Sequence, residues 1–184
     1  MHIIGGFSPT IASYISLKKN NKVKNLKEWL KKIFDIKHNI WTYVLVILFV
    51  LIYYVFGCAI NGFEFGAPIF MFIVILPMML FGGGNEEVGW RMILQPELEK
   101  KFGFHIATIF TSIIWWLWHL PIFFIRGTAN ANMNYFLFGI MCLTLCYALA
   151  TIRKVSKGVF PCILTHCLIT VSYTHLRAHE TSLH

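Results

Sequence analysis

Long runs of apolar residues, separated by short polar stretches, dominate this chain. Residues 41–60, WTYVLVILFVLIYYVFGCAI, carry no charge over the length that an α-helix needs to cross about 30 Å of hydrocarbon. Four more apolar runs follow, at 69–81, 106–125, 135–150 and 158–170. Because the last run is shorter than a membrane span requires, we interpret it as cut short. The pattern predicts an all-α fold, a polytopic transmembrane helical bundle with about five membrane segments.

Two segments precede the first long run. Residues 1–17, MHIIGGFSPTIASYISL, lack the basic start of a signal peptide, and we interpret them as the last turns of a helix that began upstream, interrupted at GGFSP. Residues 18–38 contain eight lysines among apolar residues that recur at roughly helical spacing, namely Val23, Leu26, Trp29, Leu30, Ile33 and Phe34. This spacing predicts an amphipathic helix that lies on an anionic surface.

Composition and charge support a membrane protein. Hydrophobic residues make up 57% of the chain and charged residues 13%, against about 25% charged in soluble domains. Net charge is +8, which in a soluble protein would suggest nucleic acid, but basic residues in a membrane protein first report topology. Thirteen of the sixteen, all twelve lysines and Arg153, lie in 18–37, 100–101 and 153–157, which share one side if successive runs alternate in direction. The positive-inside rule makes this side cytoplasmic. We expect a bacterial plasma membrane as location, the lipid bilayer as a partner, and no nucleic acid.

Acidic residues stand where the second apolar run ends. Asn85, Glu86 and Glu87 directly follow a glycine run, and one acidic residue at the centre of a membrane helix costs about 2.5–3.5 kcal/mol on insertion scales. Such residues need a partner or a chemical role. Asn85 can cap a helix that starts at Glu86, and Glu87 and Arg91, four residues apart, can form an ion pair on one helix face.

Histidines recur at membrane depth in two later runs. His119 lies in WWLWHLP and His166 in ILTHCLIT, and ionisable residues in such sequence usually face an interior cavity. Two carboxylates and two imidazoles can form a water-activating site: one carboxylate acts as general base, one imidazole orients the water, and the other donates hydrogen bonds to an oxyanion. A transporter with a proton-relay Glu and His pair is an alternative.

The same motifs carry a family resemblance. EEVGWR resembles the Glu-Glu-x-x-x-Arg motif of the CAAX prenyl protease and bacteriocin-processing (CPBP, or Abi) family of intramembrane proteases. WWLWHLP resembles its second motif, an aromatic residue four before a His, and HCLIT its third, His-x-x-x-Asn. Because GGFSPTIASYISL is similar to the end of the family's preceding membrane helix, the resemblance covers residues 3–170.

The resemblance implies an intramembrane endopeptidase that hydrolyses a peptide bond with a water activated by Glu86 and His119. Glu87 and Arg91 would shape the site, and His166 would help to form the oxyanion hole. The implied substrate is a peptide or protein, membrane-bound or prenylated, and bacterial members also act in bacteriocin immunity. The alternative is a non-catalytic membrane immunity or scaffold protein that binds a peptide partner. The carboxylates and histidines can act as zinc ligands, or they can work without a metal. The chain has no HExxH motif. We favour a metal-free site without a cofactor.

Two positions depart from the family pattern. Trp115 stands where the family commonly has Phe, and is expected to supply an aromatic wall. Thr170 stands where Asn is expected, and Thr lacks the reach of the Asn amide as a hydrogen-bond donor.

The end of the chain calls for a separate interpretation. VSYTHLRAHET resembles the translated read-through of a transposase mosaic-end sequencing adaptor, so we interpret 1–170 as a partial protease domain and 171–184 as a non-native tail. On this hypothesis only the first base of the Thr170 codon is native, and that base is compatible with Asn. The spacing in the tail first suggests a metal site, but its histidines are then excluded as candidates: His175, His179 and His184.

Overall fold

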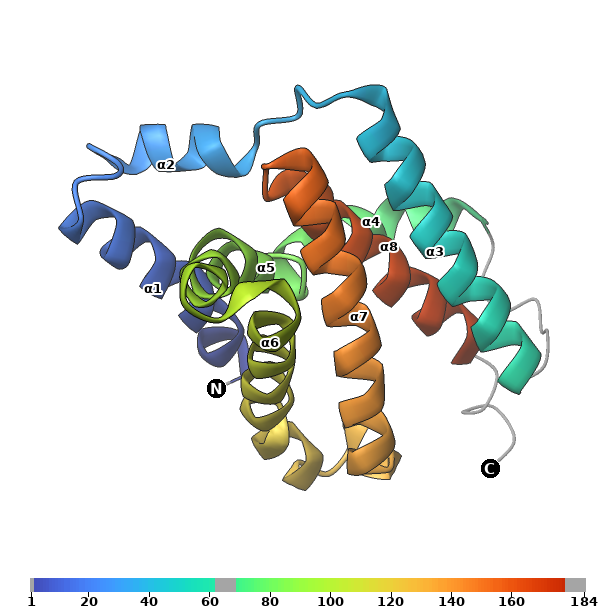
Figure 1. The fold of residues 1–184 in the computed structure, drawn as a ribbon. Helices are drawn as coiled ribbons and strands as arrows, with labels where there is room; N and C mark the ends of the chain where they lie inside the picture. Colours follow the sequence, from blue (N-terminus) through green and yellow to red (C-terminus); the bar gives the residue numbers. More distant parts are fainter. Residues whose placement is uncertain (1, 62–68, 178–184) are drawn as a thin grey trace.

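The computed structural model describes residues 2–61 and 69–177, and all regular elements in these two ranges are helical (Figure 1). The α-helices are α1 (His2–Lys19), α2 (Leu26–Ile33), α3 (Ile40–Asn61), α4 (Ile69–Gly82), α5 (Glu86–Gly89), α6 (Gln95–Trp118), α7 (Tyr135–Ser156) and α8 (Phe160–Arg177). A π-helical segment, η1 (Trp90–Leu94), joins α5 to α6, and two 3-10 segments follow α6, η2 (Leu120–Phe124) and η3 (Ala129–Asn132). The predicted all-α fold is confirmed.

Three helical segments of the described ranges are long and apolar enough to cross a membrane, namely Ile40–Ala59, Glu86–Phe124 and Tyr135–Ser156. Shorter apolar helices cover Ile73–Gly82 and Phe160–Val171. These five segments match the five predicted apolar runs, and their arrangement is a helical bundle.

Two of the predicted segments have different boundaries in the structure. The third was expected over 106–125, but α6 begins at Gln95, bends at Gly103 (φ 75°) and ends at Trp118. The polar stretch that starts at Glu86 is helical because its charged side chains form an ion pair inside the protein. The hydropathy of the sequence does not show such contacts. The fifth segment, expected to stop at residue 170, continues as α8 to Arg177.

The helices pack in pairs that place the polar segment at the centre (Figure 1). α6 packs against α7, α3 and α4 pack against α8, and α1 packs against α5. Apolar side chains along the outer helices are exposed, as expected for surfaces that face lipid: Ile47, Leu51 and Val55 on α3, and Phe70, Val74 and Met78 on α4. The buried α5 and η1 are therefore surrounded by helices whose outer faces are apolar.

α1 is continuous from His2 to Lys19, so the predicted interruption at GGFSP is wrong. Pro9 lies inside this helix. A Cβ atom at Gly89 of α5 would lie 2.7 Å from the Pro9 carbonyl oxygen, so Gly89 permits the close approach of the two helices. The Thr10 hydroxyl donates a hydrogen bond to the Asn85 carbonyl at 2.7 Å. Packing against α5 therefore outweighs the local preference of Gly and Pro for a break.

The lysine-rich segment forms a shorter helix than expected. α2 covers Leu26–Ile33, and the Asn25 side chain caps it by accepting a hydrogen bond from the Glu28 backbone N–H at 3.0 Å. Of the predicted apolar set, one half is buried in the protein and the other half is exposed; the buried half is Val23, Trp29 and Ile33, and the exposed half is Leu26, Leu30 and Phe34. α2 crosses one end of the bundle (Figure 1). Its contact with an anionic surface remains a prediction.

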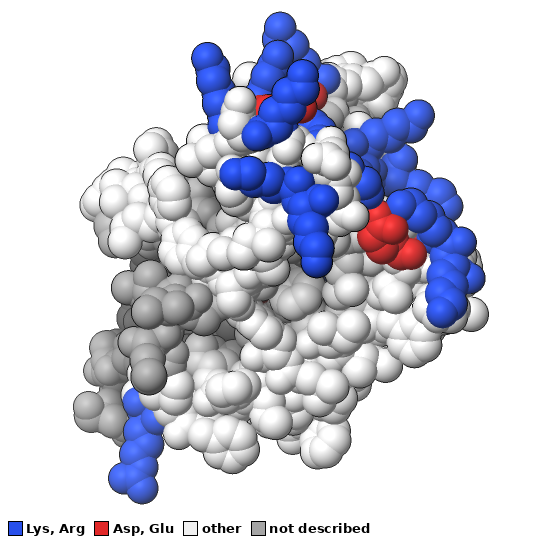
Figure 2. Space-filling view, turned by 90° about the vertical axis from the view of Figure 1, so that its left-hand side faces the viewer, with Lys and Arg blue, Asp and Glu red and all other residues white. Residues whose placement is uncertain are grey.

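The three basic segments come together at that end of the molecule, as the topology argument requires. Lys22 and Lys100 both pair with Glu97, at 3.1 and 2.7 Å. Lys154 lies over the Phe104 ring, 4.6 Å from its centroid. Figure 2 shows most of the Lys and Arg side chains in view gathered at one end, with largely uncharged surface below them and a single basic side chain at the opposite end.

Candidate active site

A glycine turn places the two adjacent carboxylates against α8. The backbone N–H groups of Gly83 and Gly84 both donate to the Met79 carbonyl, at 3.0 and 2.9 Å, which closes the end of α4. A Cβ atom at Gly84 would lie 3.1 Å from the Ile163 carbonyl oxygen and would clash with Cys167. Only glycine lets the turn approach α8 this closely, and the approach brings His166 beside α5.

Asn85 does not cap α5 with its side chain, so that prediction is wrong. Its backbone is already helical (φ −60°, ψ −24°), and the N–H of Glu86 donates to the Gly83 carbonyl at 3.0 Å. Backbone carbonyls of the glycine turn therefore satisfy the first donors of the helix. The Asn85 amide group instead donates to the Gly6 carbonyl of α1, at 3.4 Å.

Glu87 is held on both sides by charged or ionisable partners. The Arg91 Nε donates to its Oε2 at 2.8 Å, and both side chains are 0% exposed, so the predicted ion pair is confirmed. His166 Nδ1 lies 2.9 Å from Oε1 of the same carboxylate. A carboxylate only accepts, so Nδ1 carries the proton of this hydrogen bond. Both oxygens of Glu87 are therefore occupied.

Further polar side chains that the sequence interpretation missed surround Arg91. Its Nη1 donates to the Gln95 Oε1 at 3.3 Å, and its Nη2 to the Cys146 Sγ at 3.0 Å. The Gln95 amide in turn donates to Thr108 at 3.0 Å and to Glu99 at 2.8 Å. The four-residue spacing from Arg91 to Gln95 was a local signal for the first contact, whereas nothing local indicates Cys146 on α7.

Glu86 is held by a tryptophan. The Trp115 Nε1 donates to the Glu86 Oε2 at 2.8 Å in a buried contact between α6 and α5. Trp115 was expected to supply only an aromatic wall, so the structure adds a hydrogen bond that Phe could not make. Glu86 itself is 6% exposed, while Glu87 is fully buried. The two adjacent carboxylates thus differ in both partners and access.

His119 stands at the end of α6 and contacts the cluster through Trp115. Its Nδ1 lies 2.8 Å from the Trp115 carbonyl, which only accepts, so Nδ1 carries the proton and Nε2 of the neutral ring is an acceptor. Its ring packs edge-on to the Trp115 ring at 5.3 Å between centroids. The His166 ring packs on the same indole at 5.5 Å. The structure therefore places Trp115 in contact with both imidazoles and with Glu86.

The remaining candidates lie on α8 or beyond it. Thr170 lies on α8, one turn beyond His166, and is half-buried. His175 falls on the last described turn of α8, and its side chain and the residues from 178 onward lie outside the described part. Within that part, no group of three or more His, Cys, Asp or Glu side chains is placed to hold a metal ion.

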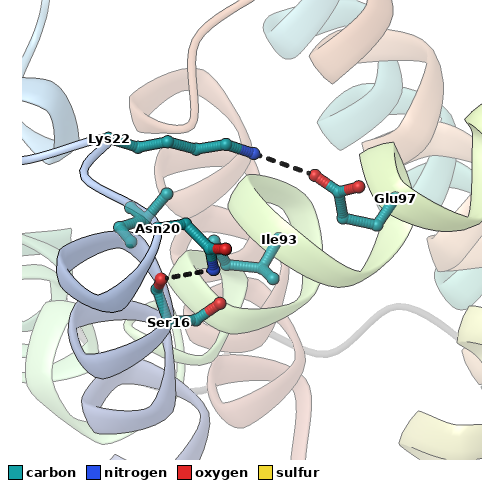
Figure 3. Close-up of a pocket in the computed structure, with 6 residues that line it drawn as sticks. Ser16, Asn20, Lys22, Ile93 and Glu97 are labelled. Carbon is teal, nitrogen blue, oxygen red and sulfur yellow. Dashed lines mark hydrogen bonds and ion pairs between the residues drawn. The ribbon is translucent and has the colours of Figure 1, made fainter.

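A surface pocket at the basic end is separate from the carboxylate cluster (Figure 3). Its volume is about 270 Å³, and its lining comes from α1, the following turn and the η1–α6 helix: Ser16, Leu17, Asn20, Lys22, Ile93 and Glu97. The Lys22–Glu97 ion pair spans it at 3.1 Å. None of the predicted site residues lines this pocket.

Comparison with known proteins identifies the family of the chain. Residues 37–172 match the family model described as type II CAAX prenyl endopeptidase Rce1-like. The chain is also similar to CAAX prenyl protease 2 of Methanococcus maripaludis, with 26% identity over 195 residues, covering 91% of this chain and 69% of that protein. The matched range contains the carboxylate pair, Arg91 and both histidines. The chain therefore belongs to the Rce1-like family of type II CAAX prenyl endopeptidases, which are membrane proteases.

Proposed function

We propose that the chain is an intramembrane endopeptidase in which Glu86 activates the attacking water. The observation that carries this assignment is the difference between the two carboxylates. Both oxygens of Glu87 accept hydrogen bonds from Arg91 and His166, and Glu87 is 0% exposed, so a water has no access to it. Glu86 accepts from Trp115 through Oε2 and keeps a partly exposed edge. Glu86 is thus the better placed general base.

His119 would orient the same water. Its Nδ1–H is held by the Trp115 carbonyl, which leaves Nε2 to accept a hydrogen bond from the water. The Trp115 indole contacts both Glu86 and the His119 ring, which supports a shared role of the two groups. A water between them would be held by two acceptors, with a lone pair free for attack.

The reaction balances with these groups alone. Glu86 takes a proton as the water oxygen bonds to the scissile carbonyl carbon, and the π electrons move to the carbonyl oxygen. The charged imidazole of His166, held at Nδ1 by Glu87, would donate from Nε2 to this oxyanion. The C–N bond then breaks, and Glu86 returns its proton to the leaving amine. No step draws on a cofactor.

The proposed substrate is a peptide or protein segment within the membrane, with a prenylated C-terminal CAAX peptide as the first compound to test. Family membership and the printed name of the archaeal relative support this choice. We further propose that the chain resides in a bacterial plasma membrane. Its basic end would lie in the cytoplasm, because the three segments that carry thirteen of the sixteen basic residues come together there.

A cleavage assay with a farnesylated, internally quenched CAAX peptide and the full chain in lipid nanodiscs tests the proposal. We expect Glu86→Gln to lower kcat by at least about a hundredfold, the usual contribution of a general base, with an unchanged melting temperature. Glu97→Gln, a matched change at the surface, should leave kcat unchanged. Failure of the wild-type protein to cleave this peptide or any member of a peptide library would contradict the proposal and favour a non-catalytic immunity or scaffold protein.

The metal-free form of the proposal has its own test. Because the steps above use only protein groups, we expect cleavage to persist after prolonged dialysis against EDTA. Loss of activity that zinc restores would contradict this part and show that the carboxylates and histidines act as metal ligands.

A further inference from the structure

α2 crosses the end of the bundle at which α3 begins (Figure 1). Only residues 34–39 separate its end at Ile33 from the candidate membrane span Ile40–Ala59. The Tyr43 hydroxyl donates a hydrogen bond to the Ile36 carbonyl at 2.6 Å, which holds this linker against the first turn of α3. Because so short a linker cannot extend far, α2 stays near the level at which α3 enters the hydrocarbon.

One face of α2 is fixed to the protein. Trp29 is buried, its indole N–H donates to the Ser13 hydroxyl of α1 at 3.1 Å, and its ring contacts Tyr14 edge-on at 5.5 Å between centroids. Ile33, one turn further along α2, is also buried. These contacts set the rotation of α2 about its own axis, so its other faces have defined directions.

An apolar edge of α2 remains exposed next to the buried face. Leu26, Leu30 and Phe34, which follow one another at intervals of four residues, are 52%, 39% and 50% exposed. At about 100° per residue, the two leucines lie on average about 60° round the helix from the buried pair Trp29 and Ile33. The apolar surface of α2 is thus wider than the face that the protein covers.

Lysines border this edge on the side away from the protein. Lys27 and Lys31 each directly follow one of the two leucines, so they lie about 100° further round the helix. Both lysines are exposed, and neither forms an ion pair with another residue of the described part. An apolar edge bordered by ammonium groups is typical of a helix that lies in the interface of a membrane.

Two observations favour a lipid leaflet as the partner of this face. Residues 18–37 contain eight lysines against two acidic residues, Glu28 and Asp35, so the partner is anionic. Ile40 and Trp41, the first two residues of α3, are 68% and 70% exposed, so apolar surface is open on both sides of the linker. A soluble acidic protein would have to enter the membrane boundary to cover both, whereas the lipid leaflet is already there.

We propose that the exposed face of α2 is a binding site for anionic phospholipids of the leaflet at the basic end. The edge formed by Leu26, Leu30 and Phe34 enters the boundary between head groups and acyl chains. The ammonium groups of Lys27 and Lys31 bind the lipid phosphates. The site is separate from the carboxylate cluster, so it does not depend on the proposed protease activity.

Fluorescence quenching tests whether the apolar edge touches acyl chains. The fluorophore NBD is attached at Leu30→Cys in the full chain, which is placed in nanodiscs of equal parts phosphatidylcholine and phosphatidylglycerol. Cys58→Ser removes the half-buried native thiol, and the other four cysteines are buried. Lipids that carry a nitroxide on the acyl chain, close to the head group, should quench this label strongly.

The matched control is a label on the opposite face of the same helix. Lys32→Cys lies two residues after Leu30 and about 160° round the helix, so its label should be quenched several-fold less. Phe34→Cys is a second position on the apolar edge if the label at residue 30 disturbs folding. Equal quenching on the two faces, or none on the apolar edge, would overturn the proposal.

Selectivity for anionic lipid is measured with the label at residue 30. The nitroxide is carried first by phosphatidylglycerol and then by phosphatidylcholine, and the ratio of the two quenching efficiencies should exceed one. Lys27→Gln together with Lys31→Gln should lower this ratio several-fold, because the attraction of one lysine to an anionic surface corresponds to about fivefold in binding.

A second double variant separates this site from the overall charge of the basic end. Lys100→Gln together with Lys101→Gln removes the same charge at the same end, but on α6, and should change the ratio by less than about twofold. Equal losses in the two double variants would attribute the enrichment to overall charge and overturn the site on α2. A ratio of one before any lysine is replaced would also overturn it.

Discussion

The continuous α5–η1–α6 helix carries two groups of ion-paired side chains. The distances between their charged atoms are similar, but one group is buried and the other is exposed. In the buried group, Arg91 Nε lies 2.8 Å from Glu87, and both side chains are 0% exposed. In the surface group, Lys22 and Lys100 lie 3.1 and 2.7 Å from Glu97, with side chains 50–64% exposed. The comparison teaches that the distance within an ion pair says little about what it contributes.

The energetic difference comes from water. Water can replace either partner of Glu97, so an exposed pair contributes about 0–1 kcal/mol. Nothing replaces a partner of Glu87, and removing one charge from a buried pair costs about 3–5 kcal/mol. The buried group is also part of a larger network, since Gln95 and Cys146 accept further hydrogen bonds from Arg91, and His166 donates one to Glu87. The buried group therefore fixes the positions of its side chains, and the surface group does not.

The largest expected effect comes from Arg91→Met. It leaves the Glu87 charge buried with only His166 as a partner, so the free energy of unfolding should fall by about 3–5 kcal/mol. Denaturant titration of the full chain in detergent measures it. Lys100→Met, which removes a cation from the same helix at the surface, is the control and should change stability by less than about 1 kcal/mol. Equal losses in the two variants would contradict the comparison.

Gln95→Leu should have the next largest effect. It leaves Arg91 Nη1 without its acceptor, at a cost of about 1–3 kcal/mol. A double-mutant cycle with Arg91→Met sharpens the prediction, because the two changes should be non-additive if they act in one network. Simple additivity in denaturant titrations would show that Gln95 and Arg91 act independently.

Close backbone approach in the buried region predicts an effect of Gly89→Ala. The new Cβ would meet the Pro9 carbonyl oxygen of α1, so overpacking should destabilise the fold by about 1–3 kcal/mol. Gly6→Ala is the matched control on α1, since a Cβ there has nothing within 4 Å. The control should be neutral or slightly stabilising, and a lower melting temperature for it than for Gly89→Ala would refute the explanation.

The smallest expected effect is that of Lys22→Met in the surface group. It should lower the free energy of unfolding by less than about 1 kcal/mol in dilute buffer. The difference from wild type should vanish at about 1 M salt, where the screening length is about 3 Å. An effect that survives high salt would mean that Lys22 contributes through packing along the pocket in Figure 3 rather than through charge.

Several features of the site were predictable because they depend on neighbours in the chain. The i, i+4 spacing predicted the Glu87–Arg91 pair, and uninterrupted hydrophobic length predicted α3 and α7. Local reasoning failed where distant helices intervene. Asn85 was expected to cap a helix, but the glycine turn already supplies the carbonyls. Pro9 was expected to interrupt α1, but the contact with Gly89 favours a continuous helix.

The sequence by itself determined the membrane class, the helical fold, the grouping of basic residues at one end and the motifs that indicated the protease family. Hydropathy, charge and short spacings encode these features, and all are read along one stretch of chain. Tertiary structure decided the partners and the burial of each carboxylate. Glu87 meets His166 across 79 residues, and Glu86 meets Trp115 across 29. No periodicity spans such separations, because these contacts depend on how whole helices pack and on where each side chain then points.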